Sequence, residues 1–321
     1  MTKIYVTRPL PEAVEARLKG MGDCTFRPST APLDGDELRA SLRDHDLVLP
    51  TLRDMYSAEV FADVPSPRAR LLANFGVGYN HIDVAAATAA GVAVSNTPGA
   101  VTDATADIGL TLMLMSCRRA AEGERLVRAG DWEGWHPVQM LGLHMTGKTL
   151  GVIGMGRIGK AVARRAALGF GMKVVFHNRS RVADPGVEAV QLDTLHEVMA
   201  AADVVIVCVP GGPATRHLVD AAAIAAMQPH AHLVNIARGD IVDESALIAA
   251  LEAGRIGGAG LDVYEDEPAV PEGLRALPNV TLLPHLGTAT LEVREAMGHM
   301  AADNLEAVLN GAPPPNAVSP D

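Results

Sequence analysis

Three polar residues in the second half of the chain have side chains that suit proton transfer beside a bound anion. Arg238, Glu267 and His285 each come shortly after a different apolar run. A guanidinium is a planar fork of donors that can hold a carboxylate and polarise a neighbouring carbonyl group. The imidazole of His285 is the natural proton donor near neutral pH, and an adjacent Glu267 would orient it and favour its protonated form. These residue types indicate acid–base chemistry on a carbonyl next to a carboxylate, although each taken singly is also typical of a structural or solvated loop residue.

A glycine-rich string between an apolar run and an alanine-rich segment is the strongest local signal in the sequence. It reads Gly-Met-Gly-Arg-Ile-Gly from Gly154 to Gly159. Between a strand and a helix these glycines are typical of a dinucleotide site: Gly154 permits the tight turn, Gly156 admits the pyrophosphate, and Gly159 lets the helix lie close to the strand. The amides of Arg157 and Ile158 would then point at the phosphates from the helix N-terminus. A glycine-rich turn that binds no ligand is the alternative, which this context disfavours.

The residues after the next apolar run discriminate between the two nicotinamide cofactors. Asn178, Arg179 and Ser180 follow that run. Arg181 comes next, and no carboxylate occurs before Asp184. An NAD site places a carboxylate here to hold the ribose hydroxyls, whereas a guanidinium and a hydroxyl would bind the 2′-phosphate of NADP. The sequence therefore predicts a preference for NADP(H), with NAD(H) left open because an arginine here can instead stack on adenine or remain a solvated loop charge.

Short β-branched runs alternate with helical segments along the whole chain. The runs predicted to be strands are Lys3–Thr7, Leu47–Leu49, Leu71–Asn74, Val92–Ser95, Thr149–Ile153, Lys173–His177, Asp203–Cys208, His232–Ile236, Ala259–Asp262 and Val280–Leu283. The clearest helical segments are Pro11–Lys19, Asp36–Arg43, Arg157–Leu168 and Glu244–Glu252. Such alternation predicts an α/β fold with parallel sheets and right-handed crossovers. Since ligands bind at the carboxyl ends of strands in open parallel sheets, the polar residues above fall where a site is expected.

The length of 321 residues predicts two domains. The string Thr97–Gly99, which reads Thr-Pro-Gly, breaks the chain before a long and largely apolar helix predicted from Val101 to about Arg128. Such a helix should be deeply packed or lie at an interface. A second long helix is predicted from about Thr288 to Leu309, and it could cross back to complete the first domain.

Composition and charge disfavour several classes of partner. The formal charge of -11 comes from 27 basic and 38 acidic residues without a basic cluster, which disfavours nucleic acid as a partner. The three cysteines are widely spaced, so a disulfide framework or a zinc site is not expected and a reducing compartment fits. The N-terminal stretch has no apolar signal core, and the longest apolar runs are far shorter than a membrane span of about 20 residues. We expect a cytoplasmic protein without a metal, nucleic-acid or membrane partner.

Together, the glycine loop and the three polar strings resemble the D-isomer-specific 2-hydroxyacid dehydrogenase family. The resemblance covers essentially the whole chain and includes the string 74–83, which reads Asn-Phe-Gly-Val-Gly-Tyr-Asn-His-Ile-Asp, and the linker 96–99. Within the family the sequence is most similar to the glyoxylate/hydroxypyruvate reductases, through the strings 102–107 and 132–137. The occurrence of all these strings in one order makes chance agreement implausible.

The resemblance implies two doubly wound parallel-sheet domains. A Rossmann dinucleotide-binding domain over 99–286 would be inserted in a flavodoxin-like substrate-binding domain made of 1–98 and 287–321. It also implies NAD(P)H-dependent reduction of a small 2-oxo acid, most of all glyoxylate or hydroxypyruvate, to the D-2-hydroxy acid. The cofactor would give the hydride while Arg238 holds the carboxylate and His285 donates the proton.

Further site residues are carried over from the motifs of the family. The amides of Val77 and Gly78 would hold the substrate carboxylate. The residues implied to meet the cofactor are Thr105 at the phosphates or the nicotinamide ribose, Pro210 near the adenine, Ala237 and Asp262 near the nicotinamide, and Gly287 after the proton donor.

Trp135 resembles a residue that relatives project across a dimer interface toward the active site of the neighbour, where it would meet substrate. A tryptophan in the interface or the core without a substrate role is the alternative. Together with the long helix from Val101, the tryptophan-bearing segment 131–137 could bury a large self-complementary surface. We therefore expect a homodimer.

Other activities stay open on the sequence. Formate dehydrogenases have a glutamine at the position of Glu267, and a phosphoglycerate dehydrogenase with a regulatory domain would need more than the 11 residues after Asn310, so both are disfavoured. Short phosphoglycerate dehydrogenases remain open, as do enzymes for larger 2-oxo acids. Pocket size would depend on packing around Leu52, Arg53, Met55, Tyr79 and Met140. A nucleotide-sensing, corepressor-like binding protein would need no turnover, but the intact catalytic set favours an enzyme.

Overall fold

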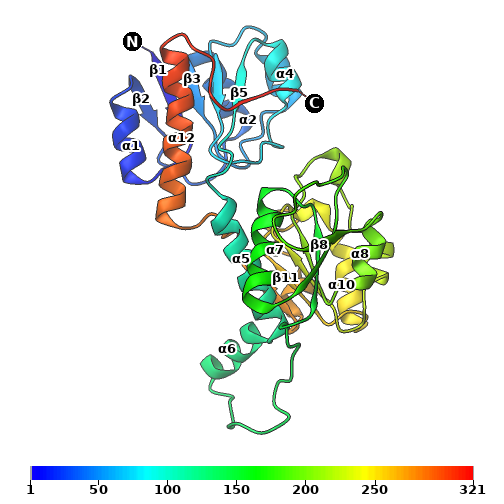
Figure 1. Ribbon diagram of the computed structural model, residues 1–321. Helices are drawn as coiled ribbons and strands as arrows, with labels where there is room; N and C mark the ends of the chain where they lie inside the picture. The colour runs from blue at the N-terminus through cyan, green and yellow to red at the C-terminus, as the bar shows by residue number, and fades with distance from the viewer. Residues whose placement is uncertain (1, 321) are drawn as a thin grey trace. The chain divides into compact units, whose positions relative to one another are not determined.

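The computed structural model describes residues 2–320 and divides into two compact units. Unit 1 runs to Val101 and resumes at Ala289, and unit 2 comprises Thr102–Thr288. The chain therefore passes from unit 1 to unit 2 after residue 101 and returns after residue 288. The sequence had predicted these boundaries after residues 98 and 286. Each unit contains a largely parallel sheet with helices packed on it (Figure 1), which confirms the predicted α/β fold class.

Unit 1 is built on a sheet of the flavodoxin type. The strands are β1 (Lys3–Val6), β2 (Asp23–Phe26), β3 (Leu47–Leu49), β4 (Leu71–Ala73), β5 (Ala93–Ser95) and β13 (Ala317–Val318). Within the described residues their order is β13-β5-β4-β3-β1-β2, and β1 to β5 all pair in parallel. The order 2-1-3-4-5 of the parallel strands is the flavodoxin-like one. At the far edge β13 runs antiparallel to β5.

The last long helix of the chain completes unit 1. The helices of this unit are α1 (Glu12–Lys19), α2 (Gly35–Asp44), α3 (Ala58–Asp63), α4 (Val84–Ala89) and α12 (Leu291–Leu309). Helix α12 packs against α1 and β4, as predicted for a helix that crosses back to the first domain. A Cβ on Gly298 of α12 would lie 2.4 Å from a methyl group of Val14 in α1, so glycine lets the two helices touch. Arg17 of α1 also forms ion pairs with Asp303 and Glu306 at 2.7 and 2.8 Å.

Unit 2 has the strand order of a dinucleotide-binding sheet. The strands are β6 (Thr149–Ile153), β7 (Lys173–His177), β8 (Ala189–Gln191), β9 (Val204–Val207), β10 (His232–Asn235), β11 (Gly258–Leu261) and β12 (Val280–Leu282). Among the described residues the order is β12-β11-β10-β9-β6-β7-β8, all parallel. This is the 3-2-1-4-5-6 order of the Rossmann fold with β12 added, and the order reverses between β6 and β9.

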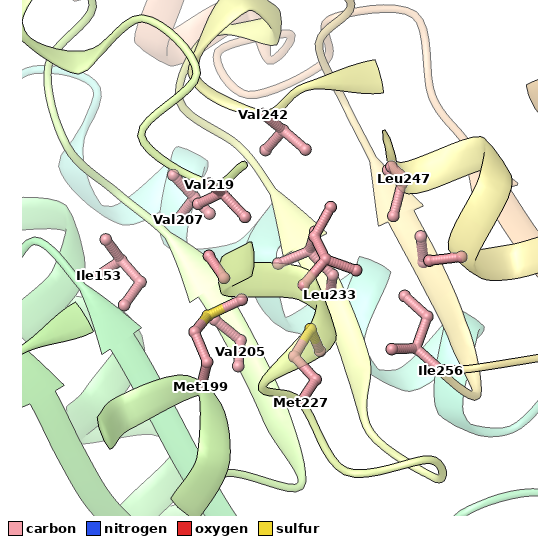
Figure 2. Packing of buried hydrophobic residues seen from close by; sticks show 14 of the residues in the cluster. Ile153, Met199, Val205, Val207, Val219, Met227, Leu233, Val242, Leu247 and Ile256 are labelled. Atoms are coloured by element: carbon pink, nitrogen blue, oxygen red, sulfur yellow. The ribbon is translucent and has the colours of Figure 1, made fainter. Parts of the chain in front are cut away.

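Helices cover both faces of the unit 2 sheet. The helices are α5 (Thr102–Cys117), α6 (Ala120–Ala129), α7 (Arg157–Phe170), α8 (Leu195–Ala201), α9 (Ala221–Ala225), α10 (Glu244–Glu252) and α11 (Glu272–Ala276), with 3-10 turns η1 (Pro213–Thr215) and η2 (Gly239–Ile241). Since side chains alternate along a strand, Val204 and Ile206 of β9 enter the core beneath α5 and α7. Val205 and Val207 enter the core beneath α8, α9 and α10 (Figure 2). Burial on both faces explains why this strand is a continuous apolar run.

All of the predicted strands are present, each within one residue of the predicted ends. The sequence did not predict β2, β8 and β13, which form sheet edges. These three strands are short and partly exposed, so they lack the apolar run that marks the inner strands.

The predicted continuous helix over 101–128 was wrong. Helix α5 ends at Cys117, and α6 begins after Arg119, which has a left-handed backbone with φ of 53°. The carbonyl of Cys117 accepts a hydrogen bond at 2.7 Å from the amide of Leu143. A Cβ on Gly142 would lie 2.3 Å from that same oxygen. The segment that carries Gly142 and Leu143 therefore satisfies the carbonyl of Cys117. In a continuous helix this carbonyl would accept a hydrogen bond from the next turn.

Candidate active site

The predicted catalytic residues follow three neighbouring strands of unit 2. Arg238 comes after β10, Glu267 after β11 and His285 after β12. Because these strands are adjacent and parallel, their carboxyl ends meet at one edge of the sheet. The fold thus brings to one place three residues that are far apart in the sequence.

His285 and Glu267 form a hydrogen-bonded pair. Nδ1 of His285 lies 3.0 Å from Oε2 and 3.2 Å from Oε1 of Glu267. The amide of Tyr264 donates to the same carboxylate at 3.1 Å. Burial raises the pKa of Glu267, but the hydrogen bond and charge of His285, the Tyr264 amide and the charge of Arg238 outweigh it, so the pKa lies below its ordinary value. An ionised Glu267 fixes the proton of the imidazole on Nδ1 and leaves Nε2 as the atom that can exchange a proton with a substrate.

The backbone of His285 is held in a left-handed conformation, with φ of 56°. Its amide donates to the carbonyl of Asp262 at 2.9 Å. The buried carboxylate of Asp262 accepts from the amides of Leu286 and Gly287 at 2.6 and 2.8 Å. Burial raises the pKa of Asp262, although these two amides and the charge of His285 oppose the rise. Asp262 therefore positions the turn that carries His285, and its implied contact with a nicotinamide stays a prediction.

Arg238 lies at the start of η2 on a loop that a buried asparagine shapes. The side chain of Asn235 donates to the carbonyl of Arg238 at 2.8 Å and accepts from the amide of Ala237 at 3.0 Å. The guanidinium itself donates to the Ala237 carbonyl at 2.6 Å. Burial lowers the pKa of Arg238, while the charges of Glu267 and Asp240 raise it. An arginine keeps its charge under such a shift, so a cation is fixed beside the His285–Glu267 pair.

Gly239 brings the loop of Arg238 against the loop of Glu267. A Cβ at this position would lie 1.8 Å from the carbonyl carbon of Tyr264 and 2.2 Å from the amide nitrogen of Glu265. Real atoms do not approach so closely, and both partners are main-chain atoms that cannot rotate away. The glycine that follows Arg238 is therefore required by the contact between two loops.

Two carboxylates that the sequence analysis did not single out hold the segment that carries Glu267. Glu244, a buried residue of α10, accepts from the amide of Glu265 at 2.8 Å. Burial raises the pKa of Glu244. The carboxylate of Glu265 in turn meets Arg216 at 2.8 Å and His217 at 2.9 Å. Because these contacts join a carboxylate to distant loops, no local sequence pattern marks them.

The glycine loop has the geometry that a pyrophosphate needs. Gly154 has φ of 96°, a left-handed backbone that other residues rarely adopt. A Cβ on Gly159 would lie 2.2 Å from the carbonyl oxygen of Gly154, so glycine lets α7 lie against the turn. At Gly156 no atom lies within 4 Å of the position where a Cβ would stand. Arg157 and Ile158 form the first turn of α7, where amides point out of the helix N-terminus, and the loop fits the diphosphate of a dinucleotide.

The other predicted cofactor residues of unit 2 lie at the same edge of its sheet. Thr105 is buried in α5, and its hydroxyl donates to the carbonyl of Gly287 at 3.1 Å. Pro210 follows β9, and its carbonyl accepts from the hydroxyl of Thr215 at 2.8 Å. Asn178 and the exposed Arg179 and Ser180 follow β7. The residues after β7 and the residue after β9 lie on opposite sides of the point between β6 and β9 where the strand order reverses.

The predicted substrate-binding residues Val77 and Gly78 belong to unit 1. The side chain of Asn96 donates to the carbonyl of Val77 at 2.8 Å, in the peptide plane of the Gly78 amide, and that of Asn74 donates to the carbonyl of Gly76 at 3.0 Å, in the peptide plane of the Val77 amide. Two asparagines thus fix the peptide planes whose amides were assigned to the substrate carboxylate. Trp135 lies in unit 2 on the segment after α6 and is 79% exposed.

No group of three or more histidine, cysteine or carboxylate side chains among residues 2–320 is arranged to hold a metal ion. In the same part of the chain, helices that combine the length and the apolar character needed to cross a membrane are absent.

Comparison with known proteins places the chain among enzymes. The model of the D-isomer-specific 2-hydroxyacid dehydrogenase NAD-binding domain matches residues 110–287. The glyoxylate reductase of Thermococcus gammatolerans is 41% identical over 322 residues, which are 99% of this chain and 96% of the relative. The glycerate dehydrogenase of Hyphomicrobium methylovorum is 38% identical over 97% of both chains.

A solved structure extends the similarity to three dimensions. The NADPH-dependent glyoxylate/hydroxypyruvate reductase of Sinorhizobium meliloti, in complex with NADP and malonate, matches with a TM-score of 0.88 and 36% identity. The match covers 99% of this chain and 96% of that one. Together with the glycine loop and the paired His285 and Glu267, these similarities show that the chain belongs to the D-isomer-specific 2-hydroxyacid dehydrogenase family.

Proposed function

We propose that the protein reduces a short 2-oxo acid, glyoxylate or hydroxypyruvate, to the D-2-hydroxy acid with NADPH as the preferred reductant. The observation that carries this proposal is the His285–Glu267 pair at 3.0 Å with Arg238 beside it, at the edge of the sheet that holds the glycine loop. Relatives with 41% and 36% identity over nearly the whole chain are glyoxylate or glyoxylate/hydroxypyruvate reductases, which supports a two- or three-carbon substrate.

The proposed mechanism assigns one task to each of the three side chains. Arg238 pairs with the substrate carboxylate and polarises the adjacent carbonyl. The glycine loop 154–159 would hold NADPH, whose chemistry when bound would be to supply a hydride for the carbonyl carbon. Protonated His285 gives its Nε2 proton to the carbonyl oxygen, so this oxygen becomes the neutral hydroxyl group of the 2-hydroxy acid. Glu267 accepts from Nδ1 at 3.0 Å and stabilises the imidazolium before the proton leaves.

The preference for NADPH is proposed from the residues after β7. Asn178, Arg179 and Ser180 stand where an NAD enzyme has a carboxylate, and both Arg179 and Arg181 are exposed. A guanidinium pairs well with a phosphate and a carboxylate would repel it. The structural relative from Sinorhizobium meliloti was solved with NADP, which supports the same assignment.

The substrate and the cofactor are tested together in a panel of initial rates. Glyoxylate, hydroxypyruvate and phenylpyruvate are each offered with NADPH and with NADH. We expect the highest kcat/KM with NADPH and one of the two small acids. A maximum with phenylpyruvate would favour an enzyme for larger 2-oxo acids, and the absence of turnover with every acid would favour the nucleotide-sensing alternative.

We also propose that the protein is a homodimer that buries the apolar surface at the end of unit 2. Large apolar side chains on α6 and the following segment are strongly exposed; they are Val127, Trp132, Trp135, Val138 and Leu141, with exposed fractions of 51–79%. Such a concentration is typical of a surface that another protein covers. Light scattering at micromolar concentration should give twice the monomer mass of 33.6 kDa, and a monomer would contradict this proposal.

We also propose that the main-chain amides of Val77 and Gly78 bind the substrate carboxylate. Their contribution would come from main-chain atoms, which side-chain substitutions leave in place. Asn96→Ala removes the donor that holds the Val77 carbonyl at 2.8 Å, so KM for glyoxylate should rise while binding of NADPH is unchanged. An unaltered KM would speak against this assignment.

A further inference from the structure

A glutamine on an edge strand holds the main chain of the loop that was assigned to the cofactor phosphate. Gln191 ends β8, where it pairs in register with Phe176 of β7. Its side-chain oxygen accepts from the amide of Val182 at 2.9 Å. Its side-chain nitrogen donates to the carbonyl of Ser180 at 3.0 Å and lies 3.4 Å from the carbonyl of Asn178. One carboxamide therefore joins three residues of the loop to the sheet.

The loop is tied at both of its ends as well. The side chain of Asn178 donates to the carbonyl of Ser180 at 3.0 Å and to its hydroxyl at 3.3 Å. At the other end, Val182 packs against the hydrophobic core beneath α5 and α7. Arg179 and Arg181 lie between these anchored points and are exposed. The main chain of the loop is thus fixed while its two guanidinium groups extend into solvent.

We propose that Gln191 is a specificity-determining positioning residue for the adenosine 2′-phosphate of the cofactor, a role that rests on the NADPH preference proposed above. Gln191 does not touch the phosphate and acts through Arg179 and Arg181. A loop that is ordered before binding loses less conformational freedom when the phosphate arrives, so the two guanidinium groups bind it more tightly. Glutamine suits this task because its side chain both donates and accepts, as contacts to an amide and to carbonyls require.

The inference is tested first by binding, without turnover. Calorimetry compares adenosine 2′,5′-bisphosphate with adenosine 5′-monophosphate, a pair of probes that differ only in the 2′-phosphate. For Gln191→Met, which keeps the length of the side chain and removes its hydrogen bonds, the Kd for the bisphosphate should rise about three- to tenfold. The Kd for the monophosphate should change by less than about twofold, because the probe lacks the phosphate that the arginines bind. Equal weakening of both probes, or no change in either, would overturn the inference.

A matched control is available in the same unit. Gln228 also donates from its side chain to a main-chain carbonyl, that of Ala200 at 2.9 Å, but it does not contact the loop 178–182 that is assigned to the cofactor phosphate. Gln228→Met should leave the Kd of both probes unchanged. Thermal unfolding of both variants separates a local effect on the loop from a loss of fold.

Kinetics then distinguish failure of this inference from failure of the proposed cofactor preference. The ratio of kcat/KM for NADPH to that for NADH is measured for the wild type, Gln191→Met, Arg179→Met and the double variant. If Gln191 acts through Arg179, the ratio should fall in the double variant by a factor smaller than the product of the factors for the two single variants. A wild-type ratio below one would refute the NADPH preference itself. A wild-type ratio above one that Gln191→Met leaves intact, or fully multiplicative losses, would refute only the role of Gln191.

Discussion

At the scale of single residues, the pair of His285 and Glu267 should carry the proton transfer. His285→Gln keeps a polar side chain but removes the proton donor, so we expect kcat for reduction to fall about 10²- to 10⁴-fold. The Kd of NADPH, followed by its fluorescence, should stay within about twofold of the wild type, because no cofactor contact is assigned to the imidazole. An activity above a tenth of the wild-type value would mean that another group donates the proton.

The same pair makes a prediction about titration. Burial raises the pKa of Glu267, and the hydrogen bond and charge of His285 are the strongest influences that lower it. Removing them in His285→Gln should therefore raise the pKa of Glu267 above its wild-type position, since burial is then less opposed. The measurement is the carboxyl ¹³C shift of Glu267 against pH. In the wild type the midpoint should lie below 4.5, and a midpoint that the substitution leaves in place would show that His285 does not stabilise the carboxylate.

The sequence marked the three residues that are proposed to react, but it did not mark the residues that support them. Arg238, Glu267 and His285 were proposed because their chemistry is unusual at the ends of apolar runs. Asn235 and Gln191 act through hydrogen bonds to main-chain atoms, and Gln191 does so across the sequence from a neighbouring strand. Neither side chain has a type or a spacing that predicts such a partner.

At the scale of elements, two loops are held together by a glycine. Gly239→Ala would place a methyl group 1.8 Å from a main-chain carbon of Tyr264, so the loop of Glu267 must move away from that of Arg238. We expect a loss of about 2–5 kcal/mol in stability and at least a tenfold loss in kcat/KM. Thermal unfolding and initial rates measure both effects. Gly169→Ala in α7, where a Cβ has no atom within 4 Å, is the control and should leave both unchanged or slightly raise stability.

The elements that the sequence predicted correctly are those with a clear hydrophobic pattern. Inner strands such as β6 and β9 are buried and apolar, so their ends could be placed within one residue. Edge strands such as β8 bury only part of their surface and lack this signal. The break between α5 and α6 depends on a bond from Leu143 to Cys117, a contact that the local pattern of the helix does not contain.

At the scale of the whole molecule, one buried histidine links stability to pH. His232 is 7% exposed at the start of β10, where Nδ1 lies 2.8 Å from the hydroxyl of Ser116. Burial, followed by the charge of His230, lowers the pKa of His232 to about 4 from an ordinary value of 6.5. The unfolded chain therefore takes up a proton at a pH where the folded chain does not, and stability falls as the pH drops from 6.5 toward 4.

The difference between the pKa of His232 in the folded and the unfolded chain corresponds to a change of about 3 kcal/mol in the free energy of unfolding. Denaturant unfolding of the full chain at pH 7, 5 and 4 should show a steeper loss of stability for the wild type than for His232→Asn. Replacement of the exposed His196 by asparagine is the control and should keep the wild-type slope. Parallel slopes for all three proteins would show that His232 is not responsible for the acid sensitivity.

The completion of unit 1 by α12 and β13 has a consequence for the order in which the molecule is made. A ribosome releases β1 to β5 early, yet the helix that packs on β4 and the strand that pairs with β5 follow only after Thr288. At about 5–20 residues per second, synthesis of the intervening unit takes on the order of 10–40 seconds. During that time the edge of β5 and the face that α12 will cover are open to chaperones, whereas unit 2, being continuous in sequence, can fold as it emerges.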